Sequence, residues 1–353
     1  MGRSALGGGL DDISIRRALA LPAILTLAML AIAAAISLRT GVSGWRVFAP
    51  YVGAWAAATL LSVLIWVFVQ VARLLPTRAD GPLRTVLARV REPARLALLP
   101  ALVFPIFLGA YTWAKCSIPF LVGYGWEATW ADADRMIFGQ DSWHWAHAVM
   151  PSAFASALTF YYAIIWGFAL VFSGTLIATF ANRRFTATYF TALMLSWLVG
   201  GIVMAFSISA AGPIFAPLTD PELAPRFAPL KAELLRLLGE DDLVMKSQRY
   251  LAAGMSSRIA LKGGGVSAMP SMHMATATLL VIAAWRTRWL WLALLFWSLT
   301  FFGSVYLGYH YAADAPIAAV VAVLCWIAAR RIHRPLDRSA SNAMPIPPAP
   351  SAV

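Results

Sequence analysis

Eight apolar runs, separated by polar segments, constrain this chain more than any other feature of its sequence. Each run approaches the roughly 20 residues that a helix needs to cross a bilayer. Hydrophobic residues make up 60% of the chain and charged residues 12%, whereas a soluble domain has about 45–50% and about 25%. We therefore predict an all-α fold, a polytopic membrane bundle of about eight transmembrane helices. The predicted crossings are 18–38, 48–72, 96–114, 154–181, 187–210, 271–285, 289–308 and 312–329.

The crossings divide the chain into three parts. Residues 1–95 are predicted to form an N-terminal two-helix membrane segment with a basic cytoplasmic loop, and residues 96–330 a six-helix core. Residues 331–353 are rich in Pro, Ala and Ser, which predicts a disordered cytoplasmic tail. Between the fifth and sixth crossings, residues 227–238 carry apolar side chains at near-helical spacing. This spacing predicts an amphipathic helix on the membrane surface or over a site.

The net charge of +12 comes mostly from arginines in the segments between the crossings. The segment 73–95 and the pairs Arg183–Arg184 and Arg286–Arg288 fall on the side of the membrane that holds both termini. Because short cytoplasmic loops carry an excess of Lys and Arg, this side is predicted to be cytoplasmic in a multi-pass protein of the cell membrane. The same scatter of arginines argues against nucleic acid as a partner, which would require a concentrated basic face.

A glycine-rich loop leads into the sixth crossing and ends in Pro270-Ser271-Met272-His273. Ser271 is placed to cap the helix that follows, and Gly265 and Ser267 lie in the loop before it. Glycines let backbone N–H groups approach an anion closely, and a helix N-terminus carries about half a positive charge. This entry therefore suits a bound phosphate group.

A second polar cluster follows the seventh crossing, where His310 and Asp314 are four residues apart. On a helix they would share a face, and the carboxylate could hold one nitrogen of the imidazole. Two crossings separate His273 from His310, so both histidines return to the same side of the membrane. With both termini in the cytoplasm, that side is the outer, non-cytoplasmic face. The two histidines are therefore predicted to form one site.

Other interpretations of these residues stay open. Two histidines and a carboxylate are a known metal ligand set, but no third His or nearby Glu accompanies His273, His310 and Asp314, so we expect neither a metal nor another cofactor. His144 and His147 could pair on a metal, yet the surrounding tryptophans favour a place at the membrane interface. A transporter that relays protons through its histidines is a further class, although no broken helices recur in two halves.

The two motifs resemble those of the type 2 phosphatidic acid phosphatase superfamily. Pro270-Ser271-Met272-His273 is similar to its P-S-x-H motif, and 303–314 is similar to its final motif, so residues 96–330 would be a catalytic core. The resemblance implies that His310 attacks phosphorus and forms a phosphohistidine, while Asp314 fixes its tautomer. His273 would protonate the leaving alkoxide and then activate the acceptor. Ser271 and the backbone of Gly265–Ser267 would hold phosphate oxygens.

Two departures from the family pattern bear on the substrate. The family's first motif, a Lys followed seven residues later by Arg-Pro, is absent upstream, and Ser304 stands where the final motif has an Arg. Arg258 and Lys262, with Arg135 behind them, are the cations that we expect to bind the phosphate instead.

This pattern is similar to the inositol phosphorylceramide synthase and sphingomyelin synthase branch, and residues 134–139 also resemble a segment of the former group. The branch implies transfer of a phospho-alcohol head group from a membrane lipid phosphate donor to an alcohol or water acceptor. The alternative within the family is a hydrolase of lipid or polyprenyl phosphates.

Overall fold

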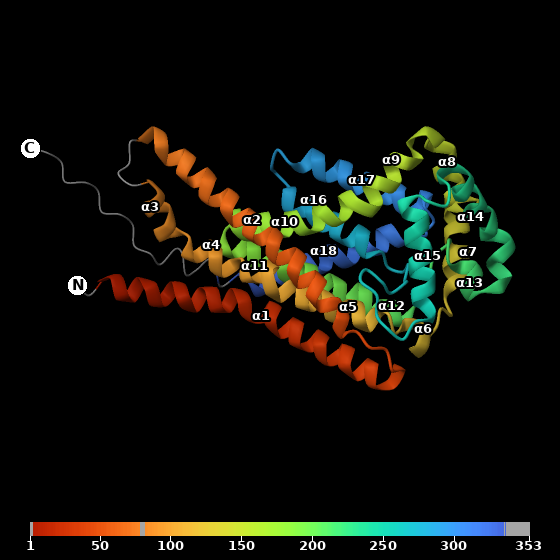
Figure 1. The fold of residues 1–353 in the computed structure, drawn as a ribbon, viewed down its shortest axis with the longest axis horizontal. Helices are drawn as coiled ribbons and strands as arrows, with labels where there is room; N and C mark the ends of the chain where they lie inside the picture. Colours follow the sequence, from red (N-terminus) through yellow and green to blue (C-terminus); the bar gives the residue numbers. More distant parts are fainter. Residues whose placement is uncertain (1–2, 78–81, 335, 337–353) are drawn as a thin grey trace, which may run out of the picture.

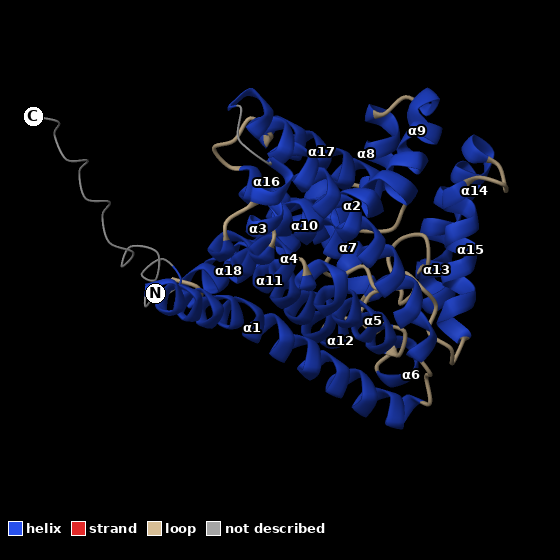
Figure 2. Cartoon of the chain, turned by 60° about the vertical axis from the view of Figure 1, so that its left-hand side comes forward, coloured by secondary structure: helices blue, strands red, loops and turns tan. Residues whose placement is uncertain are grey.

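The computed structural model describes residues 3–77, 82–334 and 336, and over these residues the chain is helical (Figure 2). No strand occurs among them; Ser43 and Ile259 form an isolated bridge. The prediction of an all-α bundle is confirmed. The eight main apolar helices are α1 (Arg3–Thr40), α2 (Phe48–Leu74), α5 (Phe104–Lys115), α10 (Trp166–Phe180), α11 (Arg183–Leu198), α16 (Met272–Ala284), α17 (Leu290–Tyr306) and α18 (Asp314–Ile332).

Six spans in the described part of the chain are long and apolar enough to cross a membrane. Three of them include a π-helical turn, where the backbone widens by one residue. These turns are η3 (Leu99–Val103), η5 (Tyr161–Ile165) and η6 (Val199–Met204), next to α5, α10 and α11 respectively. The six spans are Ile15–Thr40, Trp45–Leu74, Glu92–Leu121, Ser152–Phe180, Arg183–Ser207 and Asp314–Ile332.

The predicted crossings at 271–285 and 289–308 correspond to two shorter apolar helices. Helix α16 has 13 residues and α17 has 17 residues, which gives lengths of about 20 Å and about 26 Å. Both are shorter than the roughly 30 Å of hydrocarbon in a bilayer. His273 lies in the first turn of α16, and His310 lies in the turn that follows α17.

The crossings pack through small residues that face aromatic rings. Helix α5 packs against α1 and α2, α2 also packs against α10, and α18 packs against α11 and α16 (Figure 1). A Cβ atom on Gly109 would come within 2.7 Å of Phe48, and one on Gly201 within 2.5 Å of Tyr111. Glycine at such positions allows the close helix contacts that membrane proteins depend on.

Short helices gather at one end of the bundle, at the right of Figure 1, and we call this group the cap. In α14 the side chains of Phe227, Leu230 and Leu234 are buried and Lys231 is exposed, which confirms the amphipathic helix. Trp143, one of the tryptophans that favoured a place at the membrane interface for His144 and His147, is buried in the cap. The cap helices are α6 (Ile118–Leu121), α7 (Glu127–Phe138), α8 (Ser142–Val149), α13 (Ala216–Thr219), η7 (Pro221–Leu223), α14 (Ala224–Leu238) and α15 (Leu243–Ser256).

The end of the described chain packs against the middle of α1, away from the cap. Ala18 of α1 and Leu336 belong to one small apolar cluster. Residues 331 and 332 of the predicted tail continue α18, His333 contacts Thr191, and the tail from residue 337 lies outside the described residues. The remaining segments are η1 (Trp45–Val47), η2 (Leu75–Thr77), α3 (Pro82–Arg89), α4 (Arg91–Leu96), η4 (Ser152–Phe154), α9 (Ala155–Phe160) and α12 (Ala205–Ser207).

Candidate active site

The second motif forms a tight turn between α17 and α18. The N–H groups of Tyr309 and His310 both donate to the carbonyl of Ser304, and Gly308 has a φ of 71°. A Cβ atom at Gly308 would come within 2.6 Å of Leu230, so this position requires glycine both for its backbone and for its space. Helix α18 begins only at Asp314, so His310 and Asp314 do not share a helical face as the spacing predicted. The turn nevertheless brings the two side chains together.

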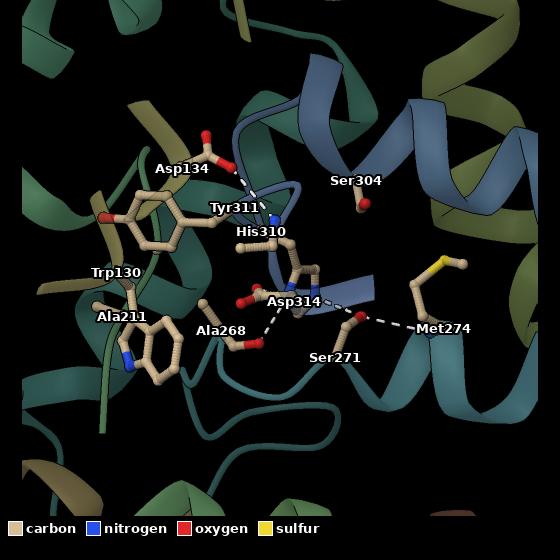
Figure 3. A network of polar contacts seen from close by, with 12 residues as sticks. Trp130, Asp134, Ala211, Ala268, Ser271, Met274, Ser304, His310, Tyr311 and Asp314 are labelled. Atoms are coloured by element: carbon tan, nitrogen blue, oxygen red, sulfur yellow. Dashed lines mark hydrogen bonds and ion pairs between the residues drawn. The ribbon is translucent and has the colours of Figure 1, made fainter. Parts of the chain in front are cut away.

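The imidazole of His310 is held in one tautomer by its hydrogen bonds (Figure 3). Its Nδ1 atom lies 2.8 Å from the carbonyl oxygen of Ala268 and 2.9 Å from Oδ2 of Asp314. A carbonyl oxygen only accepts hydrogen bonds, so Nδ1 must carry the proton and Nε2 must carry a lone pair. Burial also lowers the pKa of His310 below its ordinary value, because the charged form would lose its hydration. His310 is therefore a neutral imidazole with a free Nε2 lone pair at pH 7.

Ser271 joins the first motif to the second. Its Oγ atom accepts a hydrogen bond from the N–H of Met274 at 3.3 Å, which caps α16 as the sequence predicted. The same Oγ lies 3.2 Å from Nε2 of His310. Since Nε2 is unprotonated, the Ser271 hydroxyl donates this bond. Figure 3 shows Ser271 between Met274 and His310.

His273 faces His310 from the first turn of α16. The centroids of the two imidazole rings are 5.7 Å apart. The His273 ring also stacks on Tyr162 at 4.9 Å and lies 4.2 Å from the ring of Trp166. Neither aromatic residue was predicted to belong to the site. Both come from the π-helical turn η5 and the start of α10, and they hold the His273 ring in a fixed place.

Both histidines line a cavity of about 840 Å³. The predicted phosphate-binding residues Gly265, Ser267 and Lys262 also line it. The Oγ atom of Ser267 is buried there without a hydrogen-bond partner. A buried hydroxyl without a partner costs free energy, so Ser267 has a donor to offer to a ligand.

The structure places the two predicted arginines away from this cavity. The guanidinium of Arg258 contacts the carbonyl of Thr40 and lies 4.7 Å from the ring centroid of Phe120. It therefore ties the loop before the glycines to the end of α1. Arg135 is exposed on α7.

Lys115, the last residue of α5, is the cation that the sequence reasoning missed. It lines the cavity, and its stem packs so closely on Gly265 that a Cβ atom there would lie 2.8 Å from the Lys115 Cβ. Its charge lowers the pKa of His310 further, since two positive charges in the same space repel each other. The available signal was a lone lysine at the end of an apolar crossing, a position where a charge is costly and usually functional.

Two buried carboxylates of α7 accept hydrogen bonds from segments that lie next to the site. Asp134 accepts hydrogen bonds from the N–H of Ala313 at 3.2 Å and of Ser142 at 3.1 Å. Glu127 accepts from the N–H of Gly212 at 2.9 Å and from Oη of Tyr311 at 2.6 Å. Burial raises the pKa of both carboxyl groups above their ordinary values. They hold the segment that follows His310, through the Tyr311 hydroxyl and the Ala313 N–H.

His144 and His147 lie in the cap and away from the cavity. The His144 ring stacks on Trp143 at 3.5 Å, and Nε2 of His147 lies 2.8 Å from the carbonyl oxygen of Tyr306. Within the described residues, no group of three or more His, Cys, Asp or Glu side chains is arranged to hold a metal ion.

Comparison with known protein families identifies one match. Residues 131–329, more than half of the chain, match the family model described as the PAP2 superfamily. The matched region contains Asp134, both histidines and Asp314, whereas Lys115 precedes it. No curated protein and no solved structure is significantly similar to the chain.

Proposed function

The chain belongs to the PAP2 superfamily, and from this premise we propose that it is a membrane enzyme that transfers a phospho-alcohol head group through a phosphohistidine at His310. The observation that carries the proposal is the tautomer of His310. Its Nδ1 proton is bound by Ala268 and Asp314, which leaves the Nε2 lone pair on the side of Ser271 and the cavity. An unprotonated ring nitrogen is the form of histidine that acts as a nucleophile.

In the first half of the reaction, Nε2 of His310 attacks the phosphorus of the donor lipid. The N–P bond forms as the bond from phosphorus to the departing alkoxide breaks, and protonated His273 gives that oxygen its proton. Asp314 and the Ala268 carbonyl stabilise the positive charge that develops on the His310 ring. The product is a free lipid alcohol and a head group held on His310.

In the second half, His273 removes the proton from the hydroxyl of the acceptor. The acceptor oxygen attacks phosphorus, the N–P bond breaks, and His310 returns to its neutral form. With a second lipid alcohol as acceptor the reaction is transfer, and with water it is hydrolysis. The contacts of the His273 ring with Tyr162 and Trp166 support this double role, because they hold the ring beside the cavity in both half-reactions.

Binding of the phosphate requires donors and positive charge at the cavity wall. The hydroxyl of Ser271 would turn from Nε2 to a phosphate oxygen as the donor lipid enters. Ser267 contributes its unpartnered hydroxyl, Gly265 its backbone, and Lys115 and Lys262 their charges. In phosphoryl transfer such electrostatic stabilisation and positioning supply most of the catalysis.

Transfer is favoured over hydrolysis by the size of the cavity and by the resemblance of residues 134–139 to inositol phosphorylceramide synthases. A space of about 840 Å³ is far larger than one phosphate group and has room for the head group and for an acceptor alcohol. The hydrolysis of lipid or polyprenyl phosphates is the second candidate within the same chemistry.

The test uses purified protein with a phosphatidyl donor labelled with ³²P, with and without a long-chain lipid alcohol. We expect an acid-labile, base-stable label on the protein that is absent from His310→Ala, and a labelled lipid product that requires the alcohol. Release of labelled head group at a rate independent of the alcohol would support the hydrolase instead. If the wild-type protein carries no label and releases no phosphoryl product, and His310→Ala abolishes transport of a lipid, the results would support the transporter.

A further inference from the structure

The cavity has two chemically different ends. At the polar end it meets both histidines, Lys115 and the glycine loop, and away from them it continues between α2 and α10 as an apolar arm. The two helices are far apart in sequence but pack side by side (Figure 1). The head-group chemistry described above uses only the polar end.

One wall of the arm is an apolar face of α2 that includes several alanines, and we call this face the alanine stripe. Ala54, Ala58 and Leu61 line it at spacings of four and three residues, which places them on one face of the helix. At the polar end of the same helix, Tyr51 lines the cavity, and its hydroxyl oxygen accepts a hydrogen bond from the N–H of Gly263 at 2.7 Å. The alanines leave space where larger side chains would fill it.

The opposite wall is α10 with the turn before it. Gly167, Phe168 and Phe172 line the arm, and Tyr162 marks its polar end next to His273. From Tyr51 to Leu61, and from Tyr162 to Phe172, each wall extends by ten residues, which is about 15 Å along a helix. The walls formed by α2 and α10 therefore give the same depth for the arm, about 15 Å.

The arm opens to the side of the bundle where lipid would surround the helices. Leu61 is 46% exposed and Phe168 is 56% exposed, although both line the cavity. An apolar channel that runs from the histidines to the lipid-facing surface fits a molecule with a polar head and a hydrocarbon chain. An extended peptide would leave its backbone N–H and C=O groups unpaired in such an apolar space.

We propose that the arm between α2 and α10 binds one hydrocarbon chain of the lipid substrate and that α2 selects its length. The proposal rests on the proposed function, because the head of the same lipid must reach His310. It assigns a substrate-selecting role to a helix that lies outside the region matched by the family model. The lipid enters sideways, between Leu61 and Phe168, and its chain lies along the alanine stripe.

The first test narrows the arm with Ala58→Phe on α2 and Gly167→Phe on α10. A Cβ atom at Gly167 meets nothing within 4 Å, so a larger side chain enters open space there. The matched controls are Ala49→Phe and Gly53→Phe on exposed positions of α2 that do not line the arm; a Cβ atom at Gly53 also meets nothing within 4 Å.

Activity is compared for two donors with the same head group and chains of about 18 or about 6 carbons. We expect kcat/KM for the long-chain donor to fall at least about tenfold relative to the short-chain donor in both arm variants, since a blocked apolar pocket rejects added methylenes. The ratio should be unchanged in the controls. Equal losses for both donors, or no loss, would overturn the proposal.

The second test does not depend on turnover. A phosphatidyl lipid with a photoactivatable diazirine near the end of one chain is incubated with the wild-type protein and illuminated. We expect crosslinks on the lining faces of α2 and α10, and their loss in Ala58→Phe. Crosslinks in the arm without any lipid turnover would overturn the proposed function, but they would still support the binding of a hydrocarbon chain in the arm. Turnover with crosslinks confined to other helices would overturn the arm alone.

Discussion

The hydroxyl of Ser271 lies 3.2 Å from Nε2 of His310 and joins two motifs that are 39 residues apart in the chain. This contact places the cap of α16, and with it the helix N-terminus, beside the nitrogen that would attack phosphorus. A phosphate that displaces the Ser271 hydroxyl from Nε2 meets the nucleophile and the helix N-terminus together.

His310→Ala should abolish phosphoryl release, and Asp314→Asn should lower kcat by about 10²–10⁴-fold, because a neutral asparagine no longer stabilises the positive charge that develops on the His310 ring. Initial rates with a ³²P-labelled lipid donor provide the measurement. His144→Ala is the matched control, since this histidine is exposed in the cap and stacks on Trp143. Retention of most activity by His310→Ala would refute the nucleophile.

Lys115→Gln should lower kcat/KM by about 10–100-fold, because a charge-assisted contact to phosphate in a water-poor cavity is lost. Lys246→Gln serves as the control: Lys246 is exposed, and its partner Asp241 is fully exposed. Steady-state measurements should show the loss of kcat/KM for Lys115→Gln and no loss for Lys246→Gln. Equal kinetics for the two lysine variants would mean that Lys115 does not bind the phosphate.

Gly265→Ala should reduce activity more than Gly263→Ala does. Both glycines have positive φ, 85° and 69°, so alanine strains the backbone at each, by about 1 kcal/mol. Only at Gly265 would the new Cβ also meet the stem of Lys115, at 2.8 Å; at Gly263 it would meet nothing within 4 Å. The difference in kcat/KM between the two variants measures the displacement of Lys115. Identical losses would assign the whole effect to backbone strain.

Asp134→Ala should lower both Tm and kcat, because the N–H groups of Ala313 and Ser142 lose their acceptor and the backbone next to Asp314 is released. A buried group left unsatisfied costs about 1–3 kcal/mol of unfolding free energy. Asp134→Asn keeps one acceptor oxygen and should recover part of kcat. A purely global loss of stability would not give this recovery when kcat is measured well below the Tm of both variants. The control is Asp132→Ala on the same helix, whose carboxylate is 69% exposed in an ion pair with Arg226.

Formation of the phosphohistidine should persist below pH 6.5. Burial lowers the pKa of His310 in the folded protein, so the neutral nucleophile predominates until the pH falls below that lowered value. The matching contribution to stability is complete above the ordinary histidine pKa of about 6.5 and is lost as the pH falls from there through the folded-state pKa. Single-turnover rates with a nitrophenyl phosphodiester, which needs no protonated leaving group, provide the measurement between about pH 5 and about pH 7.5. An acid limb centred near pH 6.5 would contradict a buried neutral His310.

The sequence predicted much of this architecture because bilayer thickness and hydrophobicity limit what an apolar run can form. The helix at 48–72 and the amphipathic helix α14 were predicted with ends within a few residues, and the helix at 18–38 was predicted with its C-terminal end within two residues, although α1 begins earlier, at Arg3. The sequence did not predict how the side chains of the cap helices pack against one another. Trp143, for example, is buried in the cap, and its neighbours there come from segments far from it in the sequence.

Within the site, local spacing was informative and distant contacts were not. Ser271 was predicted to cap its helix, and the pairing of His310 with Asp314 was anticipated, although through a helical face that the turn at Gly308 replaces. Arg258 and Lys115 are similar by sequence, each a single cation near an apolar run. Only the tertiary fold sends Lys115 into the cavity and Arg258 to the carbonyl of Thr40.

The positions of Tyr51, Ala58 and Lys115 before residue 131 have a practical consequence. The histidines that would perform the proposed reaction belong to the half of the chain that matches the family, whereas much of the surface proposed to bind the lipid belongs to the other half. A compound designed to fill the space along Ala58 would therefore act selectively, sparing enzymes with the same histidines but a different N-terminal half. Exchange of the N-terminal half between such enzymes would likewise change which lipids are used, with the reaction itself left intact.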